Sequence, residues 1–282
     1  MVKGGLIKMD KQLYVMELIR LYRELGYDMK SLVEGCELNA NFIEDILEER
    51  IDLTETECDN IQEKIFKQNP ELRPVATRRF GGYPIRKMDK IYPKEGPAVF
   101  FTSDLHFGHE NVLAFDNRPF SSVEKMNEEL IARWNAKVRP GDIVYVLGDM
   151  IWKTEHCTAA ELIKKLNGTK ILIKGNHDRF LHNAEAKKCF AAIKDYEDIH
   201  VKLIDGTDRR VIMSHYFIPF YNGHLYNAIH LHGHSHVTDE AFFEERMIKD
   251  FHKDGIRHES YNVGCMYWDY EPVTLDEILF GR

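Results

Sequence analysis

From residue 98 onward the sequence alternates short β-rich runs with helical stretches. The candidate strands are residues 98–103, 143–147, 170–174, 210–214, 228–232 and 261–263. Helical patterns near residues 122–137 and 159–166 separate the early runs, and this alternation predicts an α/β sandwich. Functional groups in such folds gather at the carboxyl ends of strands, so the polar residues that follow each run are candidates for a site.

Polar motifs follow the first two runs. Asp104 and His106 come directly after the first run, and a carboxylate and an imidazole two residues apart suit Mn, Fe or Zn. Alone this pair is a weak signal, because Asp-x-His is common by chance. Gly148 and Asp149 follow the second run, where glycine lets the backbone approach a ligand closely, although an ordinary turn explains the pair equally well.

The next two runs also end in donor groups. Residues 175–178, with the sequence GNHD, follow the third run and combine an amide, an imidazole and a carboxylate in a tight turn. A simple asparagine-rich turn accounts poorly for all four residues together. His215 ends the fourth run, and taken by itself it is more typical of a hydrogen-bonded core histidine than of a ligand.

Histidine is the unusual component of this composition. Six of the 14 histidines fall within residues 215–236, a density that favours a site over solvated surface. Residues two apart in an extended segment face the same way, so His234 and His236 can address two neighbouring metals. His230 and His232 fit no motif and are expected to line the wall of the site without binding a metal.

Taken in order, the motifs DxH, GD, GNHD, H and GHxH resemble the signature of the calcineurin-like metallophosphoesterases, over residues 99–282. The resemblance implies a four-layer α/β/β/α sandwich. Flanking segments such as FTSDLHFGHENVLAFDNRPF look like a small bacterial and phage branch of that superfamily. A Ser/Thr protein phosphatase is not expected, because this chain has GDMIWK and GNHD where those enzymes carry GDxxDRG and GNHE.

Carried over to this chain, the resemblance implies two metal sites. The first metal is expected on Asp104, His106 and His236, the second on Asn176, His215 and His234, and Asp149 is expected to bridge them. His177 corresponds to the catalytic histidine, which contacts a phosphate oxygen or the leaving group, while Asp178 is expected to shape the turn or to lie behind the metal ligands. Candidate substrate contacts are His109, Asn111 and Arg118, although a loop arginine is more commonly just exposed.

The implied cofactors are two divalent metal ions, with Mn favoured and Fe, Zn or Ni as alternatives. The implied reaction is hydrolysis of a phosphoester, and of a phosphodiester above all, by in-line attack of a metal-bridging hydroxide. The expected substrate is a small phosphoester, nucleotides included. A nuclease, a phosphomonoesterase, a non-catalytic scaffold and a DNA-binding regulator stay open as alternatives, and a net charge of −6 over residues 98–282 argues mildly against long nucleic acids.

Residues 11–67 are predicted to be helical. Leu13, Met16, Ile19 and Tyr22 share one face, and Gly26 suits the position after the last turn. Asn39 is expected to cap a helix through Leu47, and Thr54 with Glu57 predicts a capping box for a helix towards Phe66.

This N-terminal part, residues 1–69, weakly resembles a helix-turn-helix domain of phage-repressor type. The segment in the place of the recognition helix, ELNANFIEDILEE, contains no basic residue, and residues 1–69 carry a net charge of −6. DNA binding depends on Lys and Arg meeting phosphates, so a helical packing or dimerisation module is the favoured interpretation.

A Pro-rich connector is predicted at residues 70–97, which hold five of the nine prolines and carry a net charge of +4. It separates the helical domain from the domain expected at residues 98–282.

Five cysteines without a CxxC pair suit reduced thiols, and the sequence contains no signal-like or membrane-spanning segment. We therefore expect a cytoplasmic protein without membrane contact, with homo-oligomerisation left open.

Overall fold

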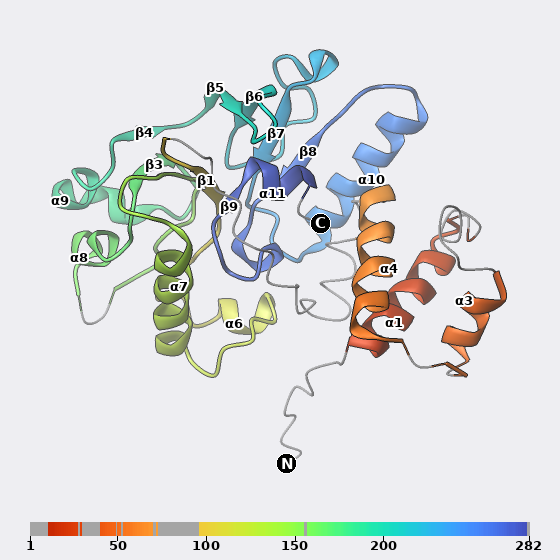
Figure 1. Ribbon diagram of the computed structural model, residues 1–282. Helices are drawn as coiled ribbons and strands as arrows, with labels where there is room; N and C mark the ends of the chain where they lie inside the picture. Colours follow the sequence, from red (N-terminus) through yellow and green to blue (C-terminus); the bar gives the residue numbers. More distant parts are fainter. Residues whose placement is uncertain are drawn as a thin grey trace. The chain divides into compact units, whose positions relative to one another are not determined.

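The computed structural model describes residues 11–27, 29, 40–48, 50–51, 53–69, 72, 96–154 and 157–280. The chain divides into two compact units, residues 1–86 and 87–282 (Figure 1). Most of the connector expected at residues 70–97 lies outside the described residues, so the domain boundaries stay a prediction. In the described part of the chain, no helix is both long and apolar enough to cross a bilayer.

The described part of the N-terminal unit is helical, as the sequence predicted. Its helices are α1 (Lys11–Glu24), α3 (Ala40–Leu47) and α4 (Glu55–Gln68). The predicted capping box at the start of α4 is present: the backbone N–H of Glu57 donates to the Thr54 hydroxyl, and that of Thr54 donates to the Glu57 carboxylate. Asn39, the cap expected for α3, lies outside the described residues.

Helix α1 buries the apolar face that its spacing predicted. Met16, Ile19 and Tyr22 are each at most 2% exposed, while the side chain of Leu13 lies outside the description. After the helix, Gly26 has a φ of +76° and its N–H donates to the carbonyl of Arg23, which is the left-handed C-terminal geometry that glycine favours. Ile65 and Phe66 of α4 are buried as well, and α4 contacts α1, so residues from these two helices form a core within this unit.

The second unit contains two sheets, and the first is mostly parallel. Its strands, in spatial order, are β4 (Ala192–Lys194), β3 (Thr169–Ile173), β2 (Ile143–Val146), β1 (Val99–Thr102) and β9 (Val273–Thr274). Strand β9 runs antiparallel to β1, whereas β1 to β4 are parallel. Apolar residues such as Phe100, Val144 and Val146 are fully buried in this sheet, as the near-continuous apolar runs of parallel strands require.

The second sheet is mixed. It consists of β5 (Glu197–Lys202), β6 (Asp208–Met213), β7 (Ile229–His232) and β8 (Ser260–Asn262) in that order. Strands β5 and β6 form an antiparallel pair, and β6, β7 and β8 are parallel. One hydrophobic core includes Phe100 and Leu172 of the first sheet together with Val211 and Leu231 of the second. The two sheets thus share a core.

Helices complete the sandwich. Helix α7 (Val123–Lys137) begins after Ser122, whose hydroxyl accepts the N–H of Lys125, and its Trp134 is buried in the shared core. The others are α6 (Val112–Phe115), α8 (Ala159–Lys164), α9 (Ala184–Lys187), α10 (Asp239–Lys253) and α11 (Leu275–Phe280), with short 3-10 turns at Arg179–His182, His224–Tyr226 and Cys265–Tyr267. The α/β class predicted from the sequence is confirmed.

The loops that follow the strands of the two sheets meet at one place. Ser103, directly after β1, forms an isolated bridge with Gly264, and Phe107 forms another with Ile151. The backbone N–H of Cys265 also donates to the carbonyl of Ser103 (2.9 Å). The segments that carry the predicted motifs are therefore fastened to one another by their backbones.

Candidate metal centre

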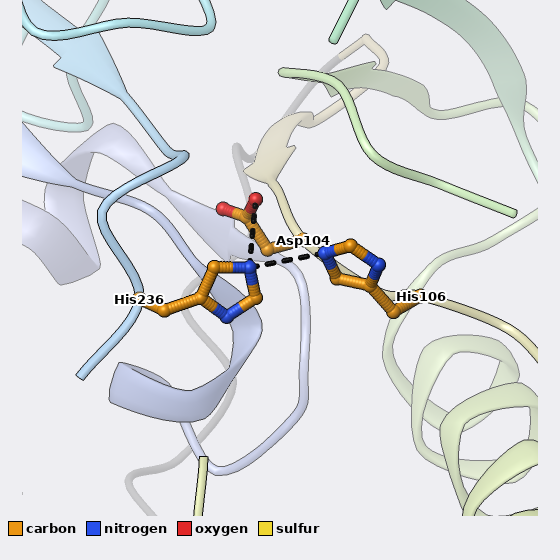
Figure 2. Close-up of side chains that lie close together, drawn as sticks. All are labelled: Asp104, His106 and His236. Atoms are coloured by element: carbon orange, nitrogen blue, oxygen red, sulfur yellow. Dashed lines mark hydrogen bonds and ion pairs between the residues drawn. The ribbon is translucent and has the colours of Figure 1, made fainter. Parts of the chain in front are cut away.

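A first group of donors joins loops from both sheets. Asp104 and His106 follow β1, and His236 lies in the loop after β7 (Figure 2). Nε2 of His106 lies 3.0 Å from Nε2 of His236, which in turn lies 3.6 Å from Oδ1 of Asp104. All three residues are buried, and they form one of the clusters whose donor atoms lie close enough together to share a metal ion.

A second group gathers around the amide oxygen of Asn176. This oxygen lies 2.9 Å from Nε2 of His215 and 3.1 Å from Nδ1 of His234. Asn176 follows β3, His215 follows β6 and His234 follows β7, so this group also draws on both sheets.

Asp149 lies between the two groups. Its Oδ2 is 3.6 Å from Nε2 of His106 and 3.6 Å from Nε2 of His215. Its Oδ1 accepts the backbone N–H of His177 at 2.8 Å, which fixes the carboxylate plane. The structure therefore brings together all seven residues for which the sequence predicted a metal-binding role.

These donors fit divalent cations. Oδ1 of Asp104 is buried and makes no hydrogen bond within the described structure, an arrangement that is costly for a carboxylate unless a cation meets it. Burial lowers the pKa of His106, and the adjacent His236 lowers it further, so His106 is neutral as a metal ligand must be. Burial also raises the pKa of Asp149, a tendency that positive charge beside the carboxylate would reverse.

Five of these seven residues hold a backbone conformation that is rare for side chains other than glycine. Their φ values are positive: 55° at Asp104, 51° at His106, 51° at Asp149, 72° at His234 and 47° at His236. Such conformations cost free energy and persist only where the surroundings enforce them, and they concentrate at functional sites.

Two glycines allow the loops to approach so closely. A Cβ on Gly148 would lie 2.5 Å from Nδ1 of His215, and one on Gly233 would lie 2.4 Å from Oδ2 of Asp104. Any larger residue would push a donor away. Both glycines belong to the sequence motifs, and close packing against the donors explains why they stand there.

Asp178 supports the turn that contains Asn176, as the sequence predicted. Its carboxylate accepts the backbone N–H groups of Asp149 (3.1 Å), Met150 (2.8 Å) and Gly175 (2.7 Å). The loops after β2 and β3 are therefore held together by one buried side chain.

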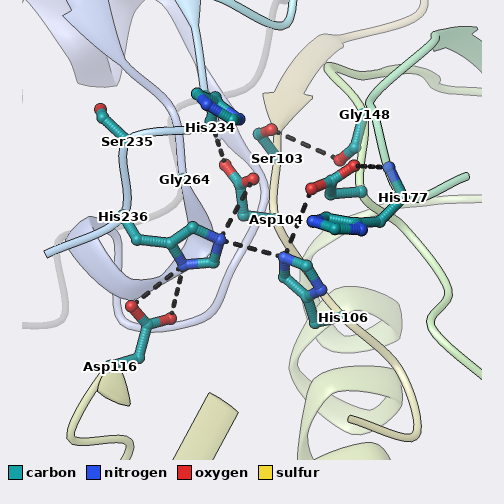
Figure 3. A network of polar contacts seen from close by, with 12 residues as sticks. Ser103, Asp104, His106, Asp116, Gly148, His177, His234, Ser235, His236 and Gly264 are labelled. Atoms are coloured by element: carbon teal, nitrogen blue, oxygen red, sulfur yellow. Dashed lines mark hydrogen bonds and ion pairs between the residues drawn. The ribbon is translucent and has the colours of Figure 1, made fainter. Parts of the chain in front are cut away.

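Asp116 has a role that the sequence reading missed. One of its carboxylate oxygens lies 2.9 Å from Nδ1 of His236, so Asp116 orients the ring whose other nitrogen faces the first donor group (Figure 3). The same oxygen accepts hydrogen bonds from Nε and Nη2 of Arg118. The only signal in the sequence is the spacing of Asp116 two residues before Arg118 in DNRPF.

Arg118 lies beneath the donor loop instead of facing a substrate. Its guanidinium donates to the carbonyls of Asp104 (2.7 Å) and Leu105 (2.9 Å), to the carboxylate of Asp116, and to the sulfur of Met126. These contacts engage all five N–H donors of a fully buried side chain. Arg118 therefore has a structural role in place of the substrate contact that was expected of it. It fixes the backbone that carries Asp104.

The other two candidates for substrate contact differ in their exposure. His109 is 9% exposed, with its ring stacked on Trp152 at a centroid distance of 4.0 Å. Asn111 is exposed and precedes α6, so it is reachable from solvent. Burial lowers the pKa of His109 to about 4, and the nearby Arg118 lowers it further, which leaves this imidazole neutral at physiological pH.

A two-sheet sandwich whose strand ends present paired carboxylate, imidazole and amide donors is the arrangement expected of a metallophosphoesterase. The family model of the calcineurin-like phosphoesterases matches residues 97–276, and the chain belongs to that family. Membership makes it a metal-dependent hydrolase of phosphoric esters.

Relatives occur in an archaeon and in phages. The chain is 37% identical over 182 residues to an uncharacterized protein, MJ1445, of Methanocaldococcus jannaschii, covering 64% of this chain and 89% of that protein. It is 29% identical over 204 residues to the Gene 66 protein of Mycobacterium phage D29, covering 64% and 93%. A crystal structure of AQ665, a protein of unknown function from Aquifex aeolicus, matches at 27% identity and a TM-score of 0.49 over 65% of this chain and 98% of that one.

Proposed function

We propose that this protein hydrolyses a phosphodiester with two divalent cations held by the two donor groups. The observation that carries the proposal is the position of Asp149, with Oδ2 at 3.6 Å from a histidine of each group. Divalent cations in such a pair supply a water of lowered pKa as the nucleophile and positive charge against the phosphoryl oxygens. The proposed ion is Mn, with Fe, Zn or Ni as alternatives, since carboxylate and amide oxygens suit Mn while imidazoles suit Fe, Zn and Ni.

His177 is the proposed catalytic residue on the leaving-group side. Its backbone N–H is tied to Asp149, and its ring centroid lies 5.9 Å from that of His106. From there the imidazole can stabilise charge on the phosphoryl group or donate a proton to the departing alkoxide.

The hydrogen bonds that occupy the guanidinium of Arg118 favour a diester substrate over a monoester substrate. A phosphodiester carries one negative charge, whereas a fully ionised monoester carries two and benefits from an additional cation beside the metals. Arg118 was a candidate for contacting a phosphate oxygen, but its donors are directed at backbone carbonyls and Asp116.

The proposal is tested by comparing two nitrophenyl esters with the Mn-loaded protein. Bis-p-nitrophenyl phosphate should be hydrolysed with a higher kcat/KM than p-nitrophenyl phosphate. Asp149→Asn should abolish hydrolysis of both esters and reduce the content of both ions, because a neutral amide bridges two cations poorly. Metal content is measured by elemental analysis of the purified protein.

Asp250→Asn provides the matched control, because Asp250 is an exposed residue of α10 that pairs with Lys253. This variant should keep full activity and both ions. Full activity and two ions in Asp149→Asn would refute the bridging role, and a preference for the monoester would refute the diester assignment alone.

A further inference from the structure

Trp152 is an exposed aromatic side chain at the edge of the metal centre. The protein has three tryptophans, of which Trp134 is 1% and Trp268 is 7% exposed, whereas Trp152 is 39% exposed. The mechanism described above makes no use of this residue. Contact with a planar ligand group would bury part of this indole surface, which is favourable.

The ring of Trp152 lies beside His106 of the donor loop and beside His177. It stacks on His109 with an interplanar angle of 8°. Its centroid lies 4.9 Å from that of His177 and 6.3 Å from that of His106. One face of the indole is thus supported by an imidazole, and the side chain borders the leaving-group side of the centre.

The backbone holds this ring in place. The N–H of Trp152 donates to the carbonyl of Phe107 at 3.0 Å, next to the bridge between Phe107 and Ile151. Gly108 packs so tightly here that a Cβ would lie 2.0 Å from the carbonyl oxygen of Lys153. The backbone of Trp152 is therefore fixed to the loop that carries His106, and the stack on His109 supports the indole, so little freedom is lost when a ligand stacks on it.

Two other exposed aromatic side chains touch the centre, but at different places. Phe115 lies against His236 at 5.3 Å, beside the first donor group, and Tyr216 lies against His234 at 4.4 Å, beside the second. Trp152 differs from them because it contacts His177. A planar group on Trp152 would belong to the part of the substrate that departs.

We infer that Trp152 determines specificity by stacking on a nucleobase carried by the leaving alcohol. The inference rests on the proposed function and names its substrate class, a phosphodiester with a nucleoside as leaving group. Stacking suits any base, because every base presents a π-face. A sugar between the phosphate and the base provides the separation between the leaving oxygen at His177 and the ring at Trp152.

Kinetics on a dinucleotide and its abasic analogues test this inference. The substrates are two thymidines joined by one phosphodiester, and two analogues that lack the base of one or the other nucleoside. Analysis of the products identifies which nucleoside leaves. Removing the base of the leaving nucleoside should lower kcat/KM about tenfold, chiefly through KM, as expected for the loss of one base stacked on an aromatic side chain. Removing the other base should change it little.

Variants of Trp152 test whether the contribution of the leaving base to kcat/KM depends on the indole. Trp152→Ala should lower kcat/KM on the intact dinucleotide about tenfold and should cause no further loss on the analogue without the leaving base. Trp152→Phe should restore most of the activity. Phe220→Ala is the control, since Phe220 is 64% exposed and its ring contacts are His224 and Phe251. Equal losses in Trp152→Ala on the intact and abasic substrates would overturn the inference.

A binding measurement separates this inference from the proposed function. Thymidine 5′-monophosphate should quench the tryptophan fluorescence of the Mn-loaded protein, deoxyribose 5-phosphate should not, and Trp152→Phe should lose the quenching. Hydrolysis of bis-p-nitrophenyl phosphate but of none of the dinucleotides would refute the inference and leave the proposed function standing. Base-dependent quenching without hydrolysis of any ester would refute the proposed function and support the stacking of a nucleobase on Trp152.

Discussion

His177 lies at the centre, but its side chain is not among the predicted metal donors. Replacing it should therefore separate chemistry from metal binding. His177→Asn should retain both ions and lose about 10²–10⁴ in rate on diesters with poor alkoxide leaving groups, the usual contribution of a general acid. Nitrophenyl esters should lose much less, because nitrophenolate departs without protonation. Rates on the two ester types and the metal content check this prediction.

Two results would change the assignment of His177. An equal loss on both ester types with both ions retained would mean that the imidazole stabilises charge on the phosphoryl oxygens and donates no proton. Loss of an ion would make His177 a ligand.

At the level of single residues, the sequence predicted the donors better than their supports. Asp104 and His234 belong to short motifs that stand next to strand ends, so the order of the motifs was enough to find them. The roles of Asp116 and Arg118 depend on contacts across 120 positions of sequence and on backbone carbonyls, neither of which leaves a local pattern. Arg118 was therefore expected at the substrate and is found beneath the loop.

At the level of elements, the tight turn after β2 depends on Gly148. Its φ is +92°, and an added Cβ would lie 2.5 Å from His215 and 2.6 Å from the Cα of Gly175. Gly148→Ala should therefore reduce metal content and activity sharply while the secondary structure persists. Circular dichroism and metal analysis check the two parts of this prediction.

Gly141 offers a matched control for the same substitution. No atom lies within 4 Å of a Cβ placed there, and its φ is outside the left-handed range. Gly141→Ala should retain metals and activity. If Gly148→Ala also keeps both ions at full occupancy, close packing of the turn is not what positions the donors.

The strands that the sequence revealed are those with apolar runs. All six predicted runs form strands, but β4, β5 and β9 were missed. Strand β9 has two residues, and β5 carries charged side chains along its length, as edge strands often do. These segments become strands because β1, β3 and β6 offer them backbone partners, which a local pattern does not display.

At the scale of the whole molecule, the two compact units predict that the second functions without the first. Every predicted metal donor lies in residues 104–236, within the unit that spans residues 87–282. Deleting residues 1–90 should leave a folded enzyme with both ions and with the kcat/KM of the full chain. Size-exclusion chromatography would show any change in oligomeric state. An insoluble or metal-free truncation would place the helical segment within the catalytic fold.

Each donor group draws on loops of both sheets: Asp104 and Asn176 follow strands of the first sheet, while His215 and His236 follow strands of the second. Ions held by these donors would link the two sheets, and separating the sheets would release the ions. An ion present at 100 times its dissociation constant adds about 2.7 kcal/mol to the free energy of unfolding. The folded fraction of the protein would therefore depend on the supply of metal.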